Sequence, residues 1–172
     1  MKKIILSGYM GSGKSTIASL LHERLRWPLL DLDAIIESRT GQSITEIFTQ
    51  KGEIFFRKLE HETLKELLSQ NESFILSLGG GTPCYANNHE LLKSEENDWI
   101  YLKASPETLL KRLLNDRGNR PLLNEKNPEE LQSFIAQHLF ERSFFYNQAR
   151  HKITTDDKSP KAVAFEIENL LA

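Results

Sequence analysis

The 172-residue sequence predicts an α/β protein, a three-layer αβα sandwich built on a parallel sheet. Short apolar runs alternate with longer stretches of helical character, which is the pattern of βαβ units with right-handed crossovers. The middle apolar runs are continuously hydrophobic, as expected when helices cover both faces of a sheet. A glycine-rich stretch directly after the first run is typical of a loop between a strand and a helix that binds phosphate.

The short apolar runs predicted as strands are 3–7, 29–32, 74–78, 99–102 and 152–154. The stretches predicted as helices are 15–25, 33–39, 43–50, 52–69, 88–94, 106–115, 128–149 and 160–171. Two of these helices have clear start signals, Ser105-Pro106-Glu107 and Asn127-Pro128-Glu129, each with an N-cap residue, a proline and an acid. Residues 116–127 lack periodicity, so they are predicted as a loop, either a mobile flap or a plain surface loop.

Length and composition predict a single domain over residues 1–172. The sequence is 39% hydrophobic and 27% charged with a formal net charge of −2, so neither a nucleic-acid nor a membrane partner is expected. The apolar stretch near the first residue is too short for a signal peptide, and the single Cys84 suits a reducing compartment. We therefore expect a cytoplasmic protein, and the lack of an apolar interface stripe favours a monomer.

The glycine-rich stretch Gly8-Tyr9-Met10-Gly11-Ser12-Gly13-Lys14-Ser15 matches the pattern GxxxxGK[ST]. Backbone N–H groups of such a loop surround phosphate oxygens, and the helix that follows directs its positive dipole end to the same place. Lys14 can contact the β- and γ-phosphates of ATP, and the Ser15 hydroxyl can bind Mg²⁺. The residues predicted to bind the nucleotide are Gly11, Ser12, Gly13, Lys14, Ser15 and Thr16. The alternative is a chance Gly/Ser turn.

Two carboxylates, Asp31 and Asp33, end the second predicted strand. Residues i and i+2 of an extended chain point to the same side, so both are expected to face the ligand-binding edge of the sheet. One would support the metal shell, and the other would orient an attacking hydroxyl and accept its proton. Alternatively, Asp33 only caps the helix that follows.

Further polar and glycine-rich features point to a substrate anion. Arg57 and Glu60 lie one helical turn apart, either as a surface ion pair or as a rigid guanidinium that meets a carboxylate bidentately. The run Gly79-Gly80-Gly81 exposes bare backbone to a polar ligand, or it forms a simple wide turn. The arginines that could neutralise transferring phosphoryl oxygens, unless they are ordinary surface residues, are Arg112, Arg117, Arg120 and Arg142.

Taken in order, the phosphate loop, Asp31-x-Asp33, Phe56-Arg57-x-x-Glu60, Gly79-Gly80-Gly81 and Arg120-Pro121-Leu122-Leu123 resemble the shikimate kinase family over essentially the whole chain. The resemblance implies a nucleoside-monophosphate-kinase-like fold with strand order 2-3-1-4-5, a substrate-binding region at about 33–61 and a mobile lid at about 112–127. It also implies transfer of the ATP γ-phosphoryl group to the 3-hydroxyl of shikimate, in the route to chorismate and aromatic amino acids.

The same resemblance implies roles for individual residues. On the nucleotide side, Lys14 holds the phosphates, Ser15 and Asp31 serve Mg²⁺, Arg120 reaches the phosphates when the lid closes, and Arg112 or Arg117 stacks on adenine. On the substrate side, Asp33 binds shikimate hydroxyls as a base or as an aligning group, Arg57 and Arg142 bind the carboxylate, Glu60 steadies Arg57, and the backbone at Gly79, Gly80 and Gly81 contacts the substrate. Phe48 and Phe56 line the apolar side of the pocket.

Two segments depart from the family pattern. The usual Arg-x-Pro-x-Tyr string is Arg142-Ser143-Phe144-Phe145-Tyr146, and the adenine-side loop at 155–160 is rich in acid. Two other functions remain open at this point: a kinase for gluconate, another small metabolite or a nucleotide, and an ATP-binding regulatory module without catalysis.

Overall fold

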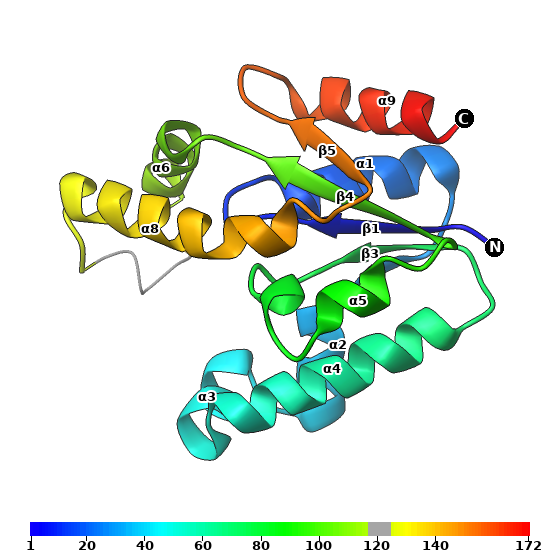
Figure 1. The fold of residues 1–172 in the computed structure, drawn as a ribbon, viewed down its shortest axis with the longest axis horizontal. Helices are drawn as coiled ribbons and strands as arrows, with labels where there is room; N and C mark the ends of the chain where they lie inside the picture. The colour runs from blue at the N-terminus through cyan, green and yellow to red at the C-terminus, as the bar shows by residue number, and fades with distance from the viewer. Residues whose placement is uncertain (117–124) are drawn as a thin grey trace.

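The computed structural model describes residues 1–116 and 125–172 of the chain. Within these residues, the strands form one parallel sheet in the order β2-β3-β1-β4-β5 (Figure 1). The strands are β1 (Lys3–Ser7), β2 (Leu29–Asp31), β3 (Phe74–Ser77), β4 (Asn97–Lys103) and β5 (His151–Thr154). The predicted fold class and strand order are therefore confirmed.

Hydrophobic layers cover both faces of the sheet. Successive residues of β1 alternate between them, since Ile4 and Leu6 belong to one buried cluster and Ile5 to the other. The first face is covered by α1 (Lys14–Leu25) and α9 (Pro160–Leu171) (Figure 1). The buried cluster that includes Ile5 also takes side chains from α2 (Leu32–Thr40), α3 (Ile44–Lys51), α4 (Glu53–Ser69), α5 (Asn88–Leu92) and α8 (Pro128–Tyr146).

A smaller hydrophobic cluster joins α6 (Pro106–Asn115) to α8. Both helices begin where the sequence predicts, because their caps form. The Ser105 hydroxyl accepts the N–H of Thr108, and Asn127 forms a reciprocal capping box with Glu130. Helix α8 ends at Tyr146, three residues before the predicted end at 149. The other predicted elements match the observed ones to within two residues at each end.

The carboxyl ends of the strands share one edge of the sheet, and the loops that follow β1, β2 and β3 gather there. The two chain termini lie together at the opposite edge (Figure 1). The Lys2 ammonium donates to the carbonyl of Leu171 at 3.1 Å. The fold thus separates its candidate site from its ends.

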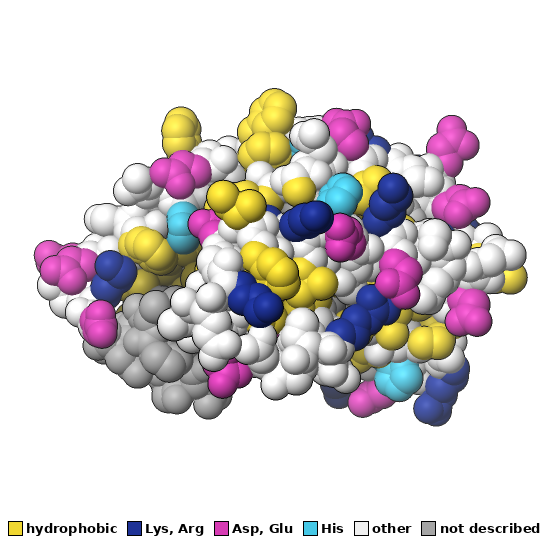
Figure 2. All heavy atoms as spheres, turned by 90° about the horizontal axis from the view of Figure 1, so that it is seen from below, with side chains coloured by type: hydrophobic (Ala, Val, Ile, Leu, Met, Phe, Trp, Pro, Cys, Tyr) yellow, Lys and Arg dark blue, Asp and Glu magenta, His cyan; other side chains and the backbone are white. Residues whose placement is uncertain are grey.

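The predicted lid at about 112–127 is only partly covered by the described residues. Arg117 and Arg120 lie outside them. No helix in 1–116 or 125–172 is long and apolar enough to cross a membrane. Seen from the side on which α4 lies, the surface mixes positive and negative side chains with hydrophobic ones (Figure 2), in keeping with the small net charge.

Candidate active site

The loop between β1 and α1 has backbone geometry that requires glycine at two positions. Gly13 is the N-cap of α1 with φ 96°, a left-handed conformation that side chains rarely adopt. A Cβ at Gly8 would lie 2.8 Å from the carbonyl oxygen of Leu102 on β4. The loop therefore lies tightly against the sheet and leads directly into the amino end of α1, where unpaired N–H groups favour an anion.

Lys14 opens α1 and folds back across this loop. Its ammonium donates to the carbonyls of Gly8 at 2.7 Å and Tyr9 at 3.2 Å. Ser15 and Thr16 are exposed in the first helical turn and line a cavity of about 670 Å³ together with Lys14. The predicted phosphate-binding residues thus surround one cavity, at the positive end of the α1 dipole.

Asp31 and Asp33 both line this cavity, but not for the reason that the sequence suggested. Strand β2 ends at Asp31, and Asp33 lies in the first turn of α2. The expectation that both belong to one extended segment is wrong. Asp31, not Asp33, caps the helix, because its Oδ1 accepts the N–H of Ala34 at 2.9 Å. Helix geometry, and not strand alternation, directs Asp33 into the cavity.

The surroundings of the Asp33 carboxyl disfavour its charged form. Burial raises its pKa to about 6, and the negative charges of Glu60 and Asp31 add to this shift. The positive charge of Lys14 acts in the opposite direction. Since the pKa in the folded protein exceeds the ordinary value of 3.8, the folded state binds this proton more tightly than the unfolded chain does.

This shift predicts how Asp33→Asn changes stability. The folded wild type is penalised as pH rises through about 6, because Asp33 must then carry its charge in a buried setting. We expect Asp33→Asn to raise the free energy of unfolding by about 2–3 kcal/mol at pH 8 and by little at pH 4. Denaturant unfolding of the ligand-free protein at both pH values measures this. The exposed Glu62→Gln is the control; an equal effect of Asp33→Asn at both pH values would contradict the assignment.

Arg57 and Glu60 form a largely buried ion pair on α4. Arg57 Nη1 donates to Glu60 Oε1 at 2.9 Å, and the two side chains are 16% and 1% exposed. The guanidinium also lies near the rings of Phe56 and Phe48, with its Cζ 5.1 Å and 5.9 Å from their centroids. The guanidinium is therefore largely buried and fixed by its neighbours on α3 and α4, and it is not part of a solvated surface pair.

The glycine run after β3 brings the predicted substrate-binding residues together. A Cβ at Gly79 would lie 3.2 Å from Asp33 Oδ1, and one at Gly81 would lie 2.8 Å from Arg57 Nη2. At Gly80, a Cβ would lie 3.2 Å from Arg142 Nη1. Each glycine thus leaves room for one charged side chain, so side chains from α2, α4 and α8 converge on bare backbone.

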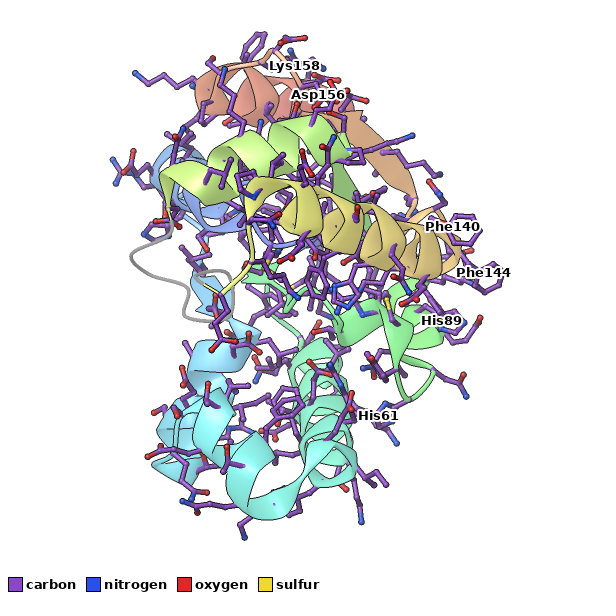
Figure 3. All side chains as sticks on the ribbon, turned by 90° about the vertical axis from the view of Figure 1, so that its left-hand side faces the viewer. His61, His89, Phe140, Phe144, Asp156 and Lys158 are labelled. Carbon is purple, nitrogen blue, oxygen red and sulfur yellow. The ribbon has the colours of Figure 1, made fainter. Side chains whose placement is uncertain are left out.

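Arg142 reaches this point from α8. Its Cζ lies 5.6 Å from the ring centroid of Tyr9, and the hydroxyl of the buried Tyr146 donates to the carbonyl of Gly80. Phe144, where the family usually has proline, lies on the outer side of α8 and is 69% exposed (Figure 3). The departure from the family string therefore changes the outer surface of α8 while Arg142 and Tyr146 face inward.

Arg112 lines the same cavity as the phosphate loop and donates hydrogen bonds across it. One of its nitrogens, Nη1, donates to the carbonyls of Gly11 at 3.3 Å and Ser12 at 3.4 Å, and to Thr155 Oγ1 at 3.1 Å. The other, Nη2, donates to the carbonyl of Thr155 at 3.2 Å. Through these hydrogen bonds Arg112 connects the phosphate loop to the segment after β5.

Sequence reasoning missed two residues beside the Arg57–Glu60 pair. Thr82 lies in η1 (Thr82–Cys84), a single 3-10 turn, and donates to Glu60 Oε2 at 2.8 Å. The ring of Tyr85 lies over the Arg57 guanidinium, 3.8 Å from Cζ. No spacing of residues along the sequence indicates either contact, because α4 and the segment after β3 come together only in the folded protein.

Comparisons with known proteins show the family to which the chain belongs. The family model described as shikimate kinase matches residues 10–172. A shikimate kinase of Flavobacterium johnsoniae is 52% identical over 172 residues, 100% of both chains. The solved structure of a Bacteroides thetaiotaomicron shikimate kinase is similar with a TM-score of 0.90 at 34% identity, covering 99% of this chain and 98% of that one. A shikimate kinase from Acinetobacter baumannii in complex with shikimate has a TM-score of 0.84 at 36% identity, with 99% and 93% covered.

Proposed function

The chain belongs to the shikimate kinase family, and from this premise we propose that it transfers the γ-phosphoryl group of ATP to the 3-hydroxyl of shikimate. The products are shikimate 3-phosphate and ADP, and the reaction belongs to the biosynthesis of chorismate and aromatic amino acids. The observation that carries this proposal is the convergence at the glycine run, where Asp33, Arg57 and Arg142 surround backbone beside the phosphate loop.

On the nucleotide side, we assign the phosphates to the loop N–H groups and to Lys14. The residues present fit a Mg²⁺ ion, because the Ser15 hydroxyl and the Asp31 and Asp33 carboxylates line the same cavity. Mg²⁺ in kinase sites is commonly held by one or two protein ligands together with water and substrate phosphates. Ser15 and Asp31 would hold Mg²⁺, which neutralises phosphate charge when bound.

On the acceptor side, Arg57 and Arg142 would bind the shikimate carboxylate, with Glu60 keeping Arg57 in place. Asp33, with a pKa of about 6, is mostly ionised at neutral pH and would accept a hydrogen bond from the attacking hydroxyl. Transition states for this transfer are loose, so holding the hydroxyl in line with the γ-phosphorus supplies much of the catalysis. Backbone groups of Gly79 to Gly81 would complete the pocket.

The lid assignments are proposals from the family resemblance. Arg120 would contact the transferring phosphoryl group, and Arg117 or Arg112 would stack on adenine. The N–H groups of Arg112 that donate to the carbonyls of Gly11, Ser12 and Thr155 lie in the guanidinium plane, so these hydrogen bonds are compatible with stacking of its face on adenine. We also propose that the protein acts as a cytoplasmic monomer, for which light scattering coupled to size exclusion is the test of mass.

The substrate is tested by coupled ADP release, with shikimate, gluconate, AMP and CMP offered separately in the presence of Mg·ATP. We expect turnover with shikimate alone. Turnover with gluconate and not with shikimate would replace the proposal with a gluconate-type kinase. Tight Mg·ATP binding without transfer to any acceptor would indicate a regulatory module.

A further inference from the structure

We propose that the segment Thr82–Tyr85 holds Arg57 in the orientation that binds the substrate carboxylate. Thr82 acts through Glu60, and Tyr85 acts on the guanidinium itself. Both are positioning residues, since neither needs to touch the substrate. The inference rests on the proposed function, in which Arg57 binds shikimate, and it goes beyond it by assigning two residues outside the family motifs.

Thr82 fixes the carboxylate on which Arg57 depends. Glu60 is 1% exposed, and within 1–116 and 125–172 its oxygens accept from two donors: Arg57 Nη1 on Oε1 at 2.9 Å and Thr82 Oγ1 on Oε2 at 2.8 Å. A buried carboxylate that loses a donor is left with an unsatisfied oxygen and must reorient or take up a proton. Either change alters the anchor of the guanidinium.

The position of Thr82 is itself fixed by further hydrogen bonds. The Asn88 amide donates to the carbonyl of Thr82 at 2.9 Å, and both residues are fully buried. Asn88 Oδ1 lies 2.7 Å from Nδ1 of His61, which belongs to the same helix as Arg57 and Glu60. This chain of hydrogen bonds therefore starts and ends on α4, and it fixes η1 relative to that helix.

Tyr85 covers the guanidinium from a second direction. Its ring centroid lies 3.8 Å from Arg57 Cζ, the shortest of the three aromatic contacts of this arginine. Ala86, the residue after Tyr85, has a φ of 50°, in the left-handed region that alanine rarely adopts. The fold tolerates this strained turn directly beside the arginine, a placement typical of functional sites.

Together, the ion pair and the ring restrict a side chain that otherwise has many rotamers. An arginine that is already ordered loses less conformational entropy when it binds a carboxylate. The guanidinium can also donate to both carboxylate oxygens at once only in one orientation. A variant in which the Arg57 side chain is less ordered should therefore bind shikimate more weakly and bind ATP as the wild type does.

The first test compares Thr82→Val with Thr82→Ser. Valine keeps the shape and removes the hydroxyl, while serine keeps the donor. We expect Thr82→Val to raise the KM for shikimate about tenfold, the effect of one lost charge-assisted hydrogen bond, with kcat and the KM for ATP within about twofold. Thr82→Ser should restore the KM to within about threefold of the wild type.

The second test compares Tyr85→Leu with Tyr85→Phe. Leucine removes the aromatic face, and phenylalanine keeps it. We expect about a fivefold rise in the KM for shikimate with leucine and less than about twofold with phenylalanine. Because Tyr85 is 37% exposed, both variants should fold even if Thr82→Val does not.

A double-mutant cycle separates positioning from a general structural effect. In an Arg57→Ala background, Thr82→Val and Tyr85→Leu should change the KM for shikimate by less than about twofold, since their effect passes through Arg57. If Arg57→Ala leaves this KM unchanged, the role given to Arg57 in the proposed function fails. If Arg57→Ala raises the KM but folded Thr82→Val and Tyr85→Leu do not, the positioning role alone is overturned.

Discussion

Replacing Lys14 by alanine is expected to lower kcat for shikimate phosphorylation by about a thousandfold or more. In the structure the Lys14 ammonium lies across the phosphate loop, on the carbonyls of Gly8 and Tyr9. From this position it can turn to the β- and γ-phosphates, where negative charge develops during transfer. A fixed charge in a cavity is worth far more than one in water. Coupled ADP release at saturating substrates measures the loss.

The control for Lys14→Ala is Lys65→Ala, which removes an exposed ammonium from the second half of α4. It should retain wild-type kcat. Thermal unfolding of Lys14→Ala must show a folded protein, because the loop carbonyls lose two donated hydrogen bonds in this variant. A folded Lys14→Ala enzyme with kcat within tenfold of the wild type would rule out the role assigned to the ammonium.

Arg57→Ala is expected to raise the KM for shikimate about a hundredfold and to change kcat little. A charge-assisted bidentate contact contributes about 3 kcal/mol, which corresponds to this factor. The buried Glu60 would also remain without its cation and would repel the substrate carboxylate. Initial rates over a range of shikimate concentrations, at saturating Mg·ATP, separate KM from kcat.

Two variants control for charge and for fold. Arg39→Ala removes an exposed arginine of α2 that pairs with Glu66 through two hydrogen bonds, and it should leave the KM unchanged. Arg57→Lys keeps the charge but loses the fork, so its KM should lie between those of the wild type and Arg57→Ala. An Arg57→Ala enzyme that is folded and has the wild-type KM would show that another group binds the carboxylate.

The layered fold could be predicted because its signals are local. Continuous apolar runs indicate strands buried on both faces, and the caps before Pro106 and Pro128 define helix starts. The strand order came from the family resemblance, since no local pattern encodes which strands are neighbours. The alternative in which Asp33 caps α2 was wrong because Asp31 and Asp33 are equally good caps by residue type, and only the end of β2 decides between them.

The candidate site could be predicted in its residue types but not in its supporting contacts. The motifs named Asp33, Arg57, Arg142 and the glycine run, which the structure brings together. Thr82 and Glu60 are separated by 22 residues, and no periodicity connects a 3-10 turn to a helix that precedes it in sequence. The hydrogen bonds from Arg112 to the carbonyls of Gly11 and Ser12 likewise join residues that are about a hundred positions apart in the sequence. They depend on how α6 lies against the loop.

The proximity of the two termini at the edge remote from the cavity has a practical consequence. A purification tag or a biosensor surface can be attached at either end without obstructing the entry of nucleotide or acceptor. A short linker between Ala172 and Met1 would also permit circular permutation. New ends opened in an exposed turn could then carry a fluorescent reporter close to the site of phosphoryl transfer.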